Sequence, residues 1–293
     1  MKIVVTIPAY NEEKTIGTVI KDIKNSLKKI KHETEILVVN DGSSDDTARI
    51  AKEAGAVVHS HPKNYGLGEA FRTEIDLALK MKADVIVHTD ADGQYRADEI
   101  PLLLSPIKNG ADLVLGSRFK GKIESMPLTK RIGNILFSIL VSYIIKQNIS
   151  DAQTGFRAFT RKVAQEAKVT STFTYTQDQI IISSRKKFKI AEVPVTFMKR
   201  DGKSRLMKGP LDYGLRGGTN LFRLARDYAP LTLFGSIGTG LIGISAVLAA
   251  YLGYRLLTYG AIGKTPTTIL TVALFVIGIQ IILFGFFADS KRK

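Results

Sequence analysis

The strongest chemical signal in the sequence is a pair of carboxylates two residues apart. Asp90 and Asp92 lie in the segment 90–94 (Asp-Ala-Asp-Gly-Gln), directly after the apolar run 85–87. At the end of a strand, two carboxylates with this spacing can share a hard cation such as Mg²⁺ or Mn²⁺, and Gln94 adds a neutral oxygen ligand. Such an ion would neutralise a diphosphate. An Asp-x-Asp alone is weak evidence because Asp is common in turns, but this position after a strand favours a metal site.

Two further polar clusters follow apolar runs nearer the N-terminus. Residues 8–12 read Pro-Ala-Tyr-Asn-Glu, and residues 40–45 read Asn-Asp-Gly-Ser-Ser-Asp. Carboxylates and an aromatic ring can hold a base and a ribose by hydrogen bonds and stacking. Taken singly, Asn11 could be a helix cap and Asp41 a turn residue. Three acidic clusters on one rim of a sheet favour a binding site over three coincidental turns.

The elements that would position these clusters alternate between strand and helix. Apolar runs predict strands at 3–7, 35–39, 57–58, 84–89 and 112–115, and helical spacing predicts helices at 16–30, 67–81 and 98–108. We expect Asn11 to cap the first helix, and Ser44 or Asp45 to open another before residue 57. This alternation predicts an α/β fold with βαβ units and a mainly parallel sheet. Ligands of such sheets sit beyond the carboxyl ends of the strands.

The C-terminal quarter predicts a membrane anchor. No charged residue occurs within 228–254 or 265–288, and each run exceeds the roughly 20 residues that cross a hydrocarbon core. Buried helices of a soluble core would keep a polar stripe. Arg223 and Arg226 precede the first run and Lys-Arg-Lys at 291–293 follows the second. The positive-inside rule therefore predicts a two-pass protein of the cell membrane, with the catalytic domain and both termini in the cytoplasm.

Two other segments suit a membrane surface. The uncharged run 132–145 is bounded by Arg131 and Lys146 and is too short to span a bilayer, so it is a core helix or an interfacial one, and its basic ends favour the interface. The segment 209–228 mixes leucines with arginines and also suits an interfacial helix. We predict a catalytic domain at 1–208 with an interfacial helix at 127–147, a juxtamembrane amphipathic helix at 209–228 and a two-helix transmembrane anchor at 229–293.

The charge balance points to an anionic partner. Lys and Arg outnumber Asp and Glu by 42 to 27, a net charge of +15, which suits a phosphorylated substrate, anionic lipid or nucleic acid, or simply a solvated basic surface. No nucleic-acid-binding module is recognisable, so we predict no nucleic-acid partner. The absence of cysteine excludes disulfides and thiolate metal sites. The four histidines lack metal-ligand spacing, and we interpret them as structural.

In their order, the motifs resemble family 2 glycosyltransferases of GT-A fold. The set comprises Pro-Ala-Tyr-Asn-Glu-Glu at 8–13, Val-Val-Asn-Asp-Gly-Ser-Ser-Asp-Asp-Thr at 38–47, Asn-Tyr-Gly-Leu-Gly at 64–68 and Asp-Ala-Asp-Gly-Gln at 90–94. Gly-Ser-Arg-Phe at 116–119 and Asp-Ala-Gln-Thr-Gly-Phe-Arg at 151–157 are similar to motifs of polyprenyl-phosphate hexose synthases, including dolichyl-phosphate mannose and glucose synthases. The resemblance covers residue 2 to about residue 205.

This resemblance implies an inverting, metal-dependent hexosyl transfer from a nucleotide sugar to dolichyl or polyprenyl phosphate. GDP-mannose is the favoured donor and UDP-glucose a close second. Asn40 stands where family members often have Asp, which leaves the base open. The residues implied in nucleotide-sugar binding are Pro8, Tyr10, Asn11, Glu12, Asp41, Asp90 and Ala91, and those implied in Mg²⁺ or Mn²⁺ binding are Asp90, Asp92 and Gln94.

The acceptor needs cations more than it needs a base. A phosphate monoester is already ionised near neutral pH, so the site must bring two anions together, and Arg matches phosphate oxygens with its planar fork. Asp151 or Asp178 could orient such a group. The predicted acceptor-phosphate ligands are Arg118, Arg131, Arg200, Lys203 and Arg205, and the predicted catalytic residues are Asp92, Arg118, Arg131 and Asp151.

Other functions fit the sequence less well. Polymerising glycan synthases resemble this chain at first but usually carry Gln-x-x-Arg-Trp, and the sequence has no Trp. A sugar nucleotidyltransferase expects a Gly-rich basic loop near the N-terminus, where residues 8–13 are acidic. A membrane polysaccharide or glycolipid synthase and a non-catalytic membrane scaffold remain alternatives. Loss of Asp92 would favour the scaffold, and Asp92 is present.

Overall fold

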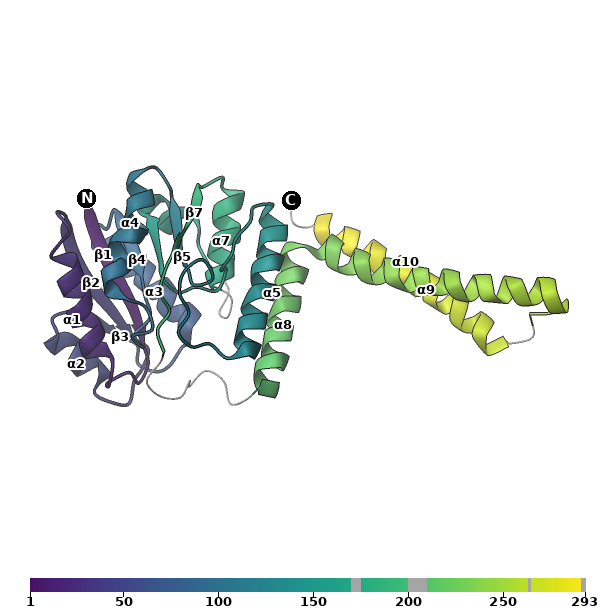
Figure 1. Cartoon of the computed structure of the whole chain (residues 1–293), viewed down its shortest axis with the longest axis horizontal. Coiled ribbons are helices and arrows are strands. Elements are labelled where there is room, and N and C mark those ends of the chain that lie inside the picture. Colours follow the sequence, from purple (N-terminus) through teal and green to yellow (C-terminus); the bar gives the residue numbers. More distant parts are fainter. Residues whose placement is uncertain (170–174, 200–209, 263–264, 291–293) are drawn as a thin grey trace. The chain divides into compact units, whose positions relative to one another are not determined.

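The fold is known from a computed structural model that describes residues 1–169, 175–199, 210–262 and 265–290. The chain forms two compact units, residues 1–217 and 218–293, drawn in Figure 1.

The first unit is built on a seven-stranded sheet of order β3-β2-β1-β4-β6-β5-β7. Strands β1 to β4 run parallel to one another, as do β5 and β7, whereas β6 is antiparallel to β4 and β5. The strands are β1 (Lys2–Ala9), β2 (Glu33–Asn40), β3 (Val57–Ser60), β4 (Val85–His88), β5 (Leu113–Ser117), β6 (Arg157–Thr160) and β7 (Ile190–Pro194). The predicted α/β fold with a mainly parallel sheet is confirmed.

Helices cover both faces of this sheet because side chains alternate along each strand. Ile3, Val5 and Ile7 of β1 belong to a buried cluster with Ile20 of α1 and Leu103 of α4. Helix α3 packs on β1 and β2. The helices of this unit are α1 (Ile16–Leu27), α2 (Thr47–Glu53), α3 (Leu67–Lys80), the 3₁₀ helix η1 (Ala97–Glu99), α4 (Ile100–Lys108), α5 (Leu128–Ile145), α6 (Arg161–Glu166) and α7 (Tyr175–Arg185).

The parallel register brings the three polar clusters of the sequence to one rim. Ala9 at the end of β1 pairs with Asn40 at the end of β2, and Thr6 of β1 pairs with His88 at the end of β4. The segments that follow these strands therefore leave the sheet at its same edge. This is the arrangement that the alternating pattern predicts.

Two predicted helix starts are wrong. Helix α1 begins at Ile16 after Thr15, so Asn11 is not its cap. Asn11 instead has a left-handed backbone (φ 54°), which Asn tolerates better than most residues, and its Oδ1 accepts a hydrogen bond from the Ser44 backbone N–H at 2.8 Å. Helix α2 begins at Thr47, after Ser44 and Asp45. Both polar segments thus form loops bonded to each other.

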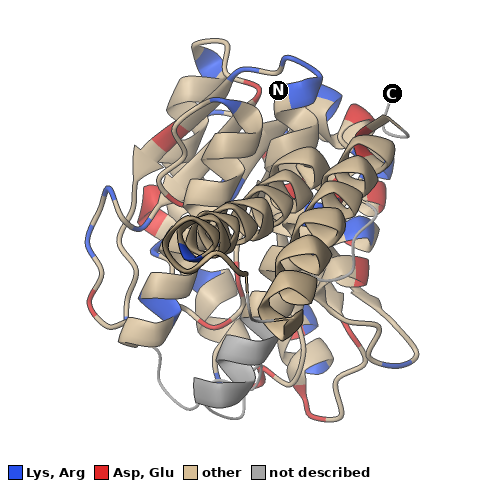
Figure 2. Ribbon diagram, turned by 90° about the vertical axis from the view of Figure 1, so that its right-hand side faces the viewer, with Lys and Arg blue, Asp and Glu red and all other residues tan. Residues whose placement is uncertain are grey.

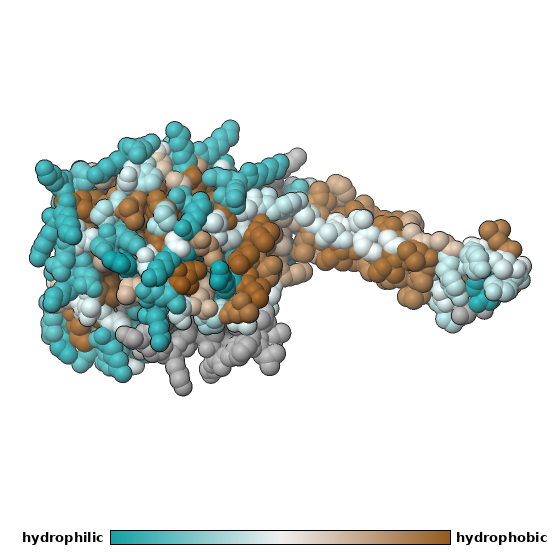
Figure 3. All heavy atoms as spheres, viewed as in Figure 1, coloured by the Kyte–Doolittle hydropathy of each residue, from teal (hydrophilic) through white to brown (hydrophobic). Residues whose placement is uncertain are grey.

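The second unit holds a pair of long apolar helices, α9 (Pro230–Tyr259) and α10 (Thr265–Ser290), after α8 (Pro210–Tyr228), which crosses the unit boundary. The two helices pack closely, since a Cβ on Gly238 would lie 2.5 Å from the Gly278 carbonyl oxygen. Ser245 Oγ donates a hydrogen bond to the Thr271 carbonyl at 2.8 Å. Figure 2 shows almost no charge on this pair and Figure 3 shows its largely apolar surface.

Three helices in the described part of the chain are long and apolar enough to cross a membrane: α5, α9 and α10. The sequence predicts two spans and assigns no span to the α5 segment. Helix α5 buries Phe137 and Val141 within the first unit, while Leu128, Ile132 and Ile139 are exposed on it. A helix with one face fixed to the domain suits an interface, and this assignment stays a prediction.

Gly42 should be required for stability of the first unit. It has φ +70°, and an added Cβ would lie 2.3 Å from the Lys63 backbone carbon. Gly42→Ala should cost about 1–3 kcal/mol more than Gly110→Ala, because Gly110 has φ +90° and open space around it. Denaturant unfolding of both variants, followed by circular dichroism, measures the difference. Equal losses would contradict the close approach at Gly42.

Candidate active site

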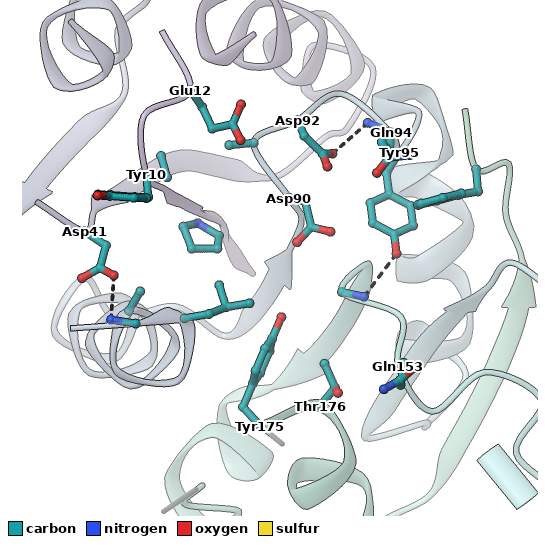
Figure 4. Close-up of a pocket in the computed structure, with 18 of the residues that line it drawn as sticks. Tyr10, Glu12, Asp41, Asp90, Asp92, Gln94, Tyr95, Gln153, Tyr175 and Thr176 are labelled. Carbon is teal, nitrogen blue, oxygen red and sulfur yellow. Dashed lines mark hydrogen bonds between the residues drawn. The ribbon is translucent and has the colours of Figure 1, made fainter. Parts of the chain in front are cut away.

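A cavity of about 440 Å³ opens beyond the ends of β1, β2 and β4. Figure 4 shows the carboxyl groups of Asp90 and Asp92 in it, with Tyr10 and Asp41 on one side and Tyr95 on another. The residues predicted from the sequence that line the cavity are Pro8, Tyr10, Glu12, Asp41, Asp90, Ala91, Asp92, Gln94 and Arg118. Asn11, Arg131 and Asp151 do not line it. Arg200, Lys203 and Arg205 lie outside the described residues.

Asp90 is the electrostatic centre of this cavity. Desolvation by the surrounding protein and the charge of nearby Asp92 together raise the pKa of Asp90 to about 6, against the opposing effects of His88, Arg118 and Lys130. Gly155 lies directly against the carboxylate, since a Cβ there would come within 2.8 Å of Asp90 Oδ1. Two carboxylates held this way repel each other, and a bound cation would relieve the repulsion.

The carboxylate pair fits a divalent ion that a substrate helps to hold. The described residues contain no group of three or more His, Asp or Glu side chains that could bind a metal. Mg²⁺, however, is often bound by one or two carboxylates together with substrate phosphates and water. Gln94 lies beside the pair, but its Nε2 donates to the Met198 carbonyl at 3.1 Å. Its role as a ligand, through the other amide atom, stays a prediction.

Arg118 supplies a buried cation to the same cavity. Its Nε and Nη2 donate to the two carboxylate oxygens of Asp151 at 2.7 and 2.8 Å, in a bidentate pair. Burial acts to lower the pKa of Arg118, but Tyr95, Asp151 and Asp90 raise it, so Arg118 stays charged. Asp151 is fully engaged by this pair, and it is therefore placed to orient Arg118.

Glu192 of β7 holds the segment that carries Asp151. Its Oε1 accepts hydrogen bonds from the backbone N–H groups of Ser150 and Asp151 at 2.9 and 3.2 Å. Its Oε2 lies 2.8 Å from Lys120 Nζ. The position of Arg118 therefore depends on β7 as well as on the loop before β6.

The start of α5 contributes a second cation that the sequence analysis missed. Lys130 and Asn134 are one helical turn apart, and both line the cavity. Arg131, which the sequence favoured, is exposed on the same helix. Successive residues of a helix point in different directions, so Lys130 lines the cavity and its neighbour Arg131 does not. The charge of the two side chains does not reveal this difference.

A buried chain of polar groups runs from α3 through β4 to the cavity. His88 Nδ1 lies 2.7 Å from Glu74 Oε2, and His88 Nε2 lies 3.4 Å from the Tyr175 hydroxyl. Burial raises the pKa of Glu74. Tyr175 and Thr176, at the start of α7, line the cavity, and Figure 4 shows the Tyr175 hydroxyl directed toward Asp90. Asp178 is buried but does not line the cavity.

Comparison with known proteins gives the family. Residues 4–167, more than half of the chain, match the family model for glycosyl transferase family 2. A dolichyl-phosphate hexose transferase of Haloferax volcanii is 33% identical over 204 residues, 69% of this chain and 85% of the relative. A UDP-N-acetylglucosamine–dolichyl-phosphate N-acetylglucosaminyltransferase of Methanococcus voltae is 33% identical over 212 residues, 64% and 82% of the two chains. The chain belongs to glycosyl transferase family 2.

A solved structure shows the same fold. Glucosyl-3-phosphoglycerate synthase of Mycobacterium tuberculosis, in complex with Mn²⁺, UDP and its product, is similar with a TM-score of 0.59 and 22% identity. The similarity covers 75% of this chain and 77% of that one. The resemblance to family 2 glycosyltransferases and the predicted GT-A fold are thus confirmed.

The raised pKa of Asp90 predicts pH-dependent cation binding. A protonated carboxyl must lose its proton to bind Mn²⁺, so Mn²⁺ affinity should rise as the pH passes upward through about 6 and then level off. Calorimetric titration of the whole chain with Mn²⁺ below, at and above this pH measures the effect. The Asp90→Asn variant should show a weaker and flatter response. Affinity that is equal at all three pH values would contradict the placement of Asp90 in the cation site.

Proposed function

We propose that this family 2 glycosyltransferase transfers a hexose from a nucleotide sugar to a polyprenyl or dolichyl phosphate. One observation carries the proposal: a single cavity joins the carboxylates Asp90 and Asp92 to the cations Arg118 and Lys130, in a chain with long apolar helices. Two relatives act, by their names, on dolichyl phosphate. These features support two anionic substrates, one of them attached to lipid.

The donor half of the cavity is the part near the N-terminal strands. Tyr10 offers a ring for stacking and Asp41 a carboxylate for hydrogen bonding to the nucleoside. Pro8, Glu12 and Ala91 also line this cavity. We assign Asp90 and Asp92, with Gln94, to an Mg²⁺ or Mn²⁺ ion; when bound, it would supply positive charge to the leaving diphosphate. The solved synthase of the same fold contains Mn²⁺ and UDP, which supports this assignment.

The acceptor half uses cations in place of a general base. A phosphate monoester oxygen, already ionised, attacks the anomeric carbon while the bond to the diphosphate breaks, with inversion. Arg118, oriented by Asp151, and Lys130 would hold that phosphate in line, which supplies proximity and charge stabilisation. A further set of cations remains assigned to the acceptor from the sequence: Arg131, Arg200, Lys203 and Arg205.

The membrane supplies the acceptor. We assign α9 and α10 as two spans, because both are long, apolar and largely exposed along their outer sides. The α5 helix and the 209–228 segment would lie at the lipid surface, with the catalytic unit and both termini in the cytoplasm. This arrangement would bring a lipid-linked phosphate within reach of a membrane-bound domain.

The proposal is tested by a transfer assay with polyprenyl phosphate and a panel of nucleotide sugars, read by the mass of the lipid product. Asp92→Asn should lower the rate by about a hundredfold or more, with unchanged unfolding temperature, because a ligand is lost and no packing. The exposed carboxylate Asp98 forms an ion pair with Arg96, two residues away, so Asp98→Asn is the control and should keep activity. Chelation should abolish transfer, and Mg²⁺ or Mn²⁺ should restore it. Full transfer in excess chelator would exclude the metal role.

The two neighbouring cations of α5 provide a second test. Lys130→Ala should raise the polyprenyl phosphate concentration for half-maximal rate roughly ten- to a hundredfold, because Lys130 lines the cavity. The exposed Arg131 should show the same kind of effect at smaller size when changed to Ala. Titration of each substrate against each variant separates acceptor from donor. If both changes weaken the nucleotide sugar as much as the lipid, the acceptor site has been misplaced.

A further inference from the structure

The side chain of Asp41 lies at the donor end of the cavity and already accepts three hydrogen bonds. It is buried, 4% exposed, yet it lines the cavity. Its Oδ1 accepts from the Tyr65 backbone N–H at 2.9 Å and lies 2.7 Å from His61 Nδ1. Its Oδ2 accepts from the Gly66 backbone N–H at 2.8 Å. Figure 4 marks one hydrogen bond of the Asp41 carboxylate with a dashed line.

His61 must be a donor to this carboxylate. An ionised carboxylate can only accept, so the Nδ1 atom of His61 carries the proton. The other ring nitrogen, Nε2, lies 2.9 Å from Thr73 Oγ1. The hydroxyl of Thr73 therefore holds the ring in this orientation from behind.

The remaining acceptor capacity of Asp41 can be counted. Each carboxylate oxygen offers two lone-pair positions. Tyr65 and His61 fill both positions on Oδ1, and Gly66 fills one on Oδ2. No further donor to Asp41 is found in the described part of the chain, so one position is left for a ligand.

The count distinguishes between nucleobases. Uracil presents one N–H, flanked by two carbonyl oxygens, and a single acceptor position satisfies it. Guanine presents an N–H beside an amino group, a pair that a carboxylate binds with both oxygens. At Asp41 the guanine amino group would lose that partner, and a buried unpaired donor is costly.

We infer that the donor nucleotide is a uridine nucleotide and that His61 sets this selectivity by occupying an acceptor position on Asp41. The inference rests on the proposed function, since it concerns the nucleotide of the same donor site. It reverses the order of preference that the sequence suggests, in which GDP-mannose precedes UDP-glucose.

Calorimetric titration of the full chain, in detergent micelles with Mn²⁺, compares UDP with GDP. We expect UDP to bind at least about tenfold more tightly, which corresponds to about 1.4 kcal/mol. The His61→Leu variant frees a position on Oδ1 and should narrow the ratio severalfold, chiefly through tighter GDP binding. Loss of structure would weaken the binding of both nucleotides, so it cannot explain a gain of GDP affinity.

His59→Leu is the matched control. His59 is an exposed residue of β3, two residues before His61. Among the groups discussed, it contacts only the ring of His61. This variant should keep the wild-type ratio. If His61→Leu fails to fold, the wild-type ratio alone decides the base.

The outcomes separate the inference from the proposed function. GDP binding equal to or tighter than UDP binding overturns the inference and leaves hexosyl transfer standing. A ratio unchanged in folded His61→Leu overturns the role of His61. If the wild-type chain binds neither nucleotide with Mn²⁺, the proposed function fails and the inference fails with it.

Discussion

The site depends on one electrostatic constraint: Asp90 is held, half-buried, beside Asp92. Desolvation by the surrounding protein, together with repulsion by Asp92, raises the pKa of Asp90 to about 6, and the neighbouring groups accommodate the pair. Gly155 provides room where a Cβ would collide with the carboxylate, and Arg118 and Lys130 place positive charge nearby. The parallel register of β1, β2 and β4 fixes the pair at the end of the sheet where a ligand can reach it. The carboxylate pair, with positive charge nearby, thus links the fold to the chemistry.

Sequence patterns predicted the first five strands of the sheet and missed the last two. Strands β1, β4 and β5 and the second half of β2 follow apolar runs that are buried on both faces, so their pattern is plain. The antiparallel strand β6 begins with Arg157, and the edge strand β7 contains Glu192 and is only partly buried, so neither has a continuous apolar run and the sequence analysis did not assign them. The starts of α1 and α2 were misplaced because Asn11 and the 43–45 segment bond to each other across a long sequence separation. No local rule contains that contact.

The same division holds for the candidate site. Asp90, Asp92 and Asp41 follow strands directly, so their place at the rim could be inferred from sequence. Lys130 was missed because only the helical phase of α5 decides that it, and not Arg131, faces the cavity. His61 was interpreted as merely structural, since nothing in its neighbourhood in sequence reveals its bond to Asp41. Groups that act through a partner distant in sequence become visible only in three dimensions.

Helix α5 carries one set of side chains that lines the cavity and another that is exposed. Lys130 and Asn134 line the cavity, while Ile132 and Ile139 are exposed. On a lipid surface, the depth to which the exposed isoleucines insert into the bilayer would set the height of the cavity above the headgroups. A helix in this position would fix that height, so phosphates displayed there would meet the cations and those attached to shorter or longer headgroups would not. Selection among membrane lipids would then follow from distance as well as from charge.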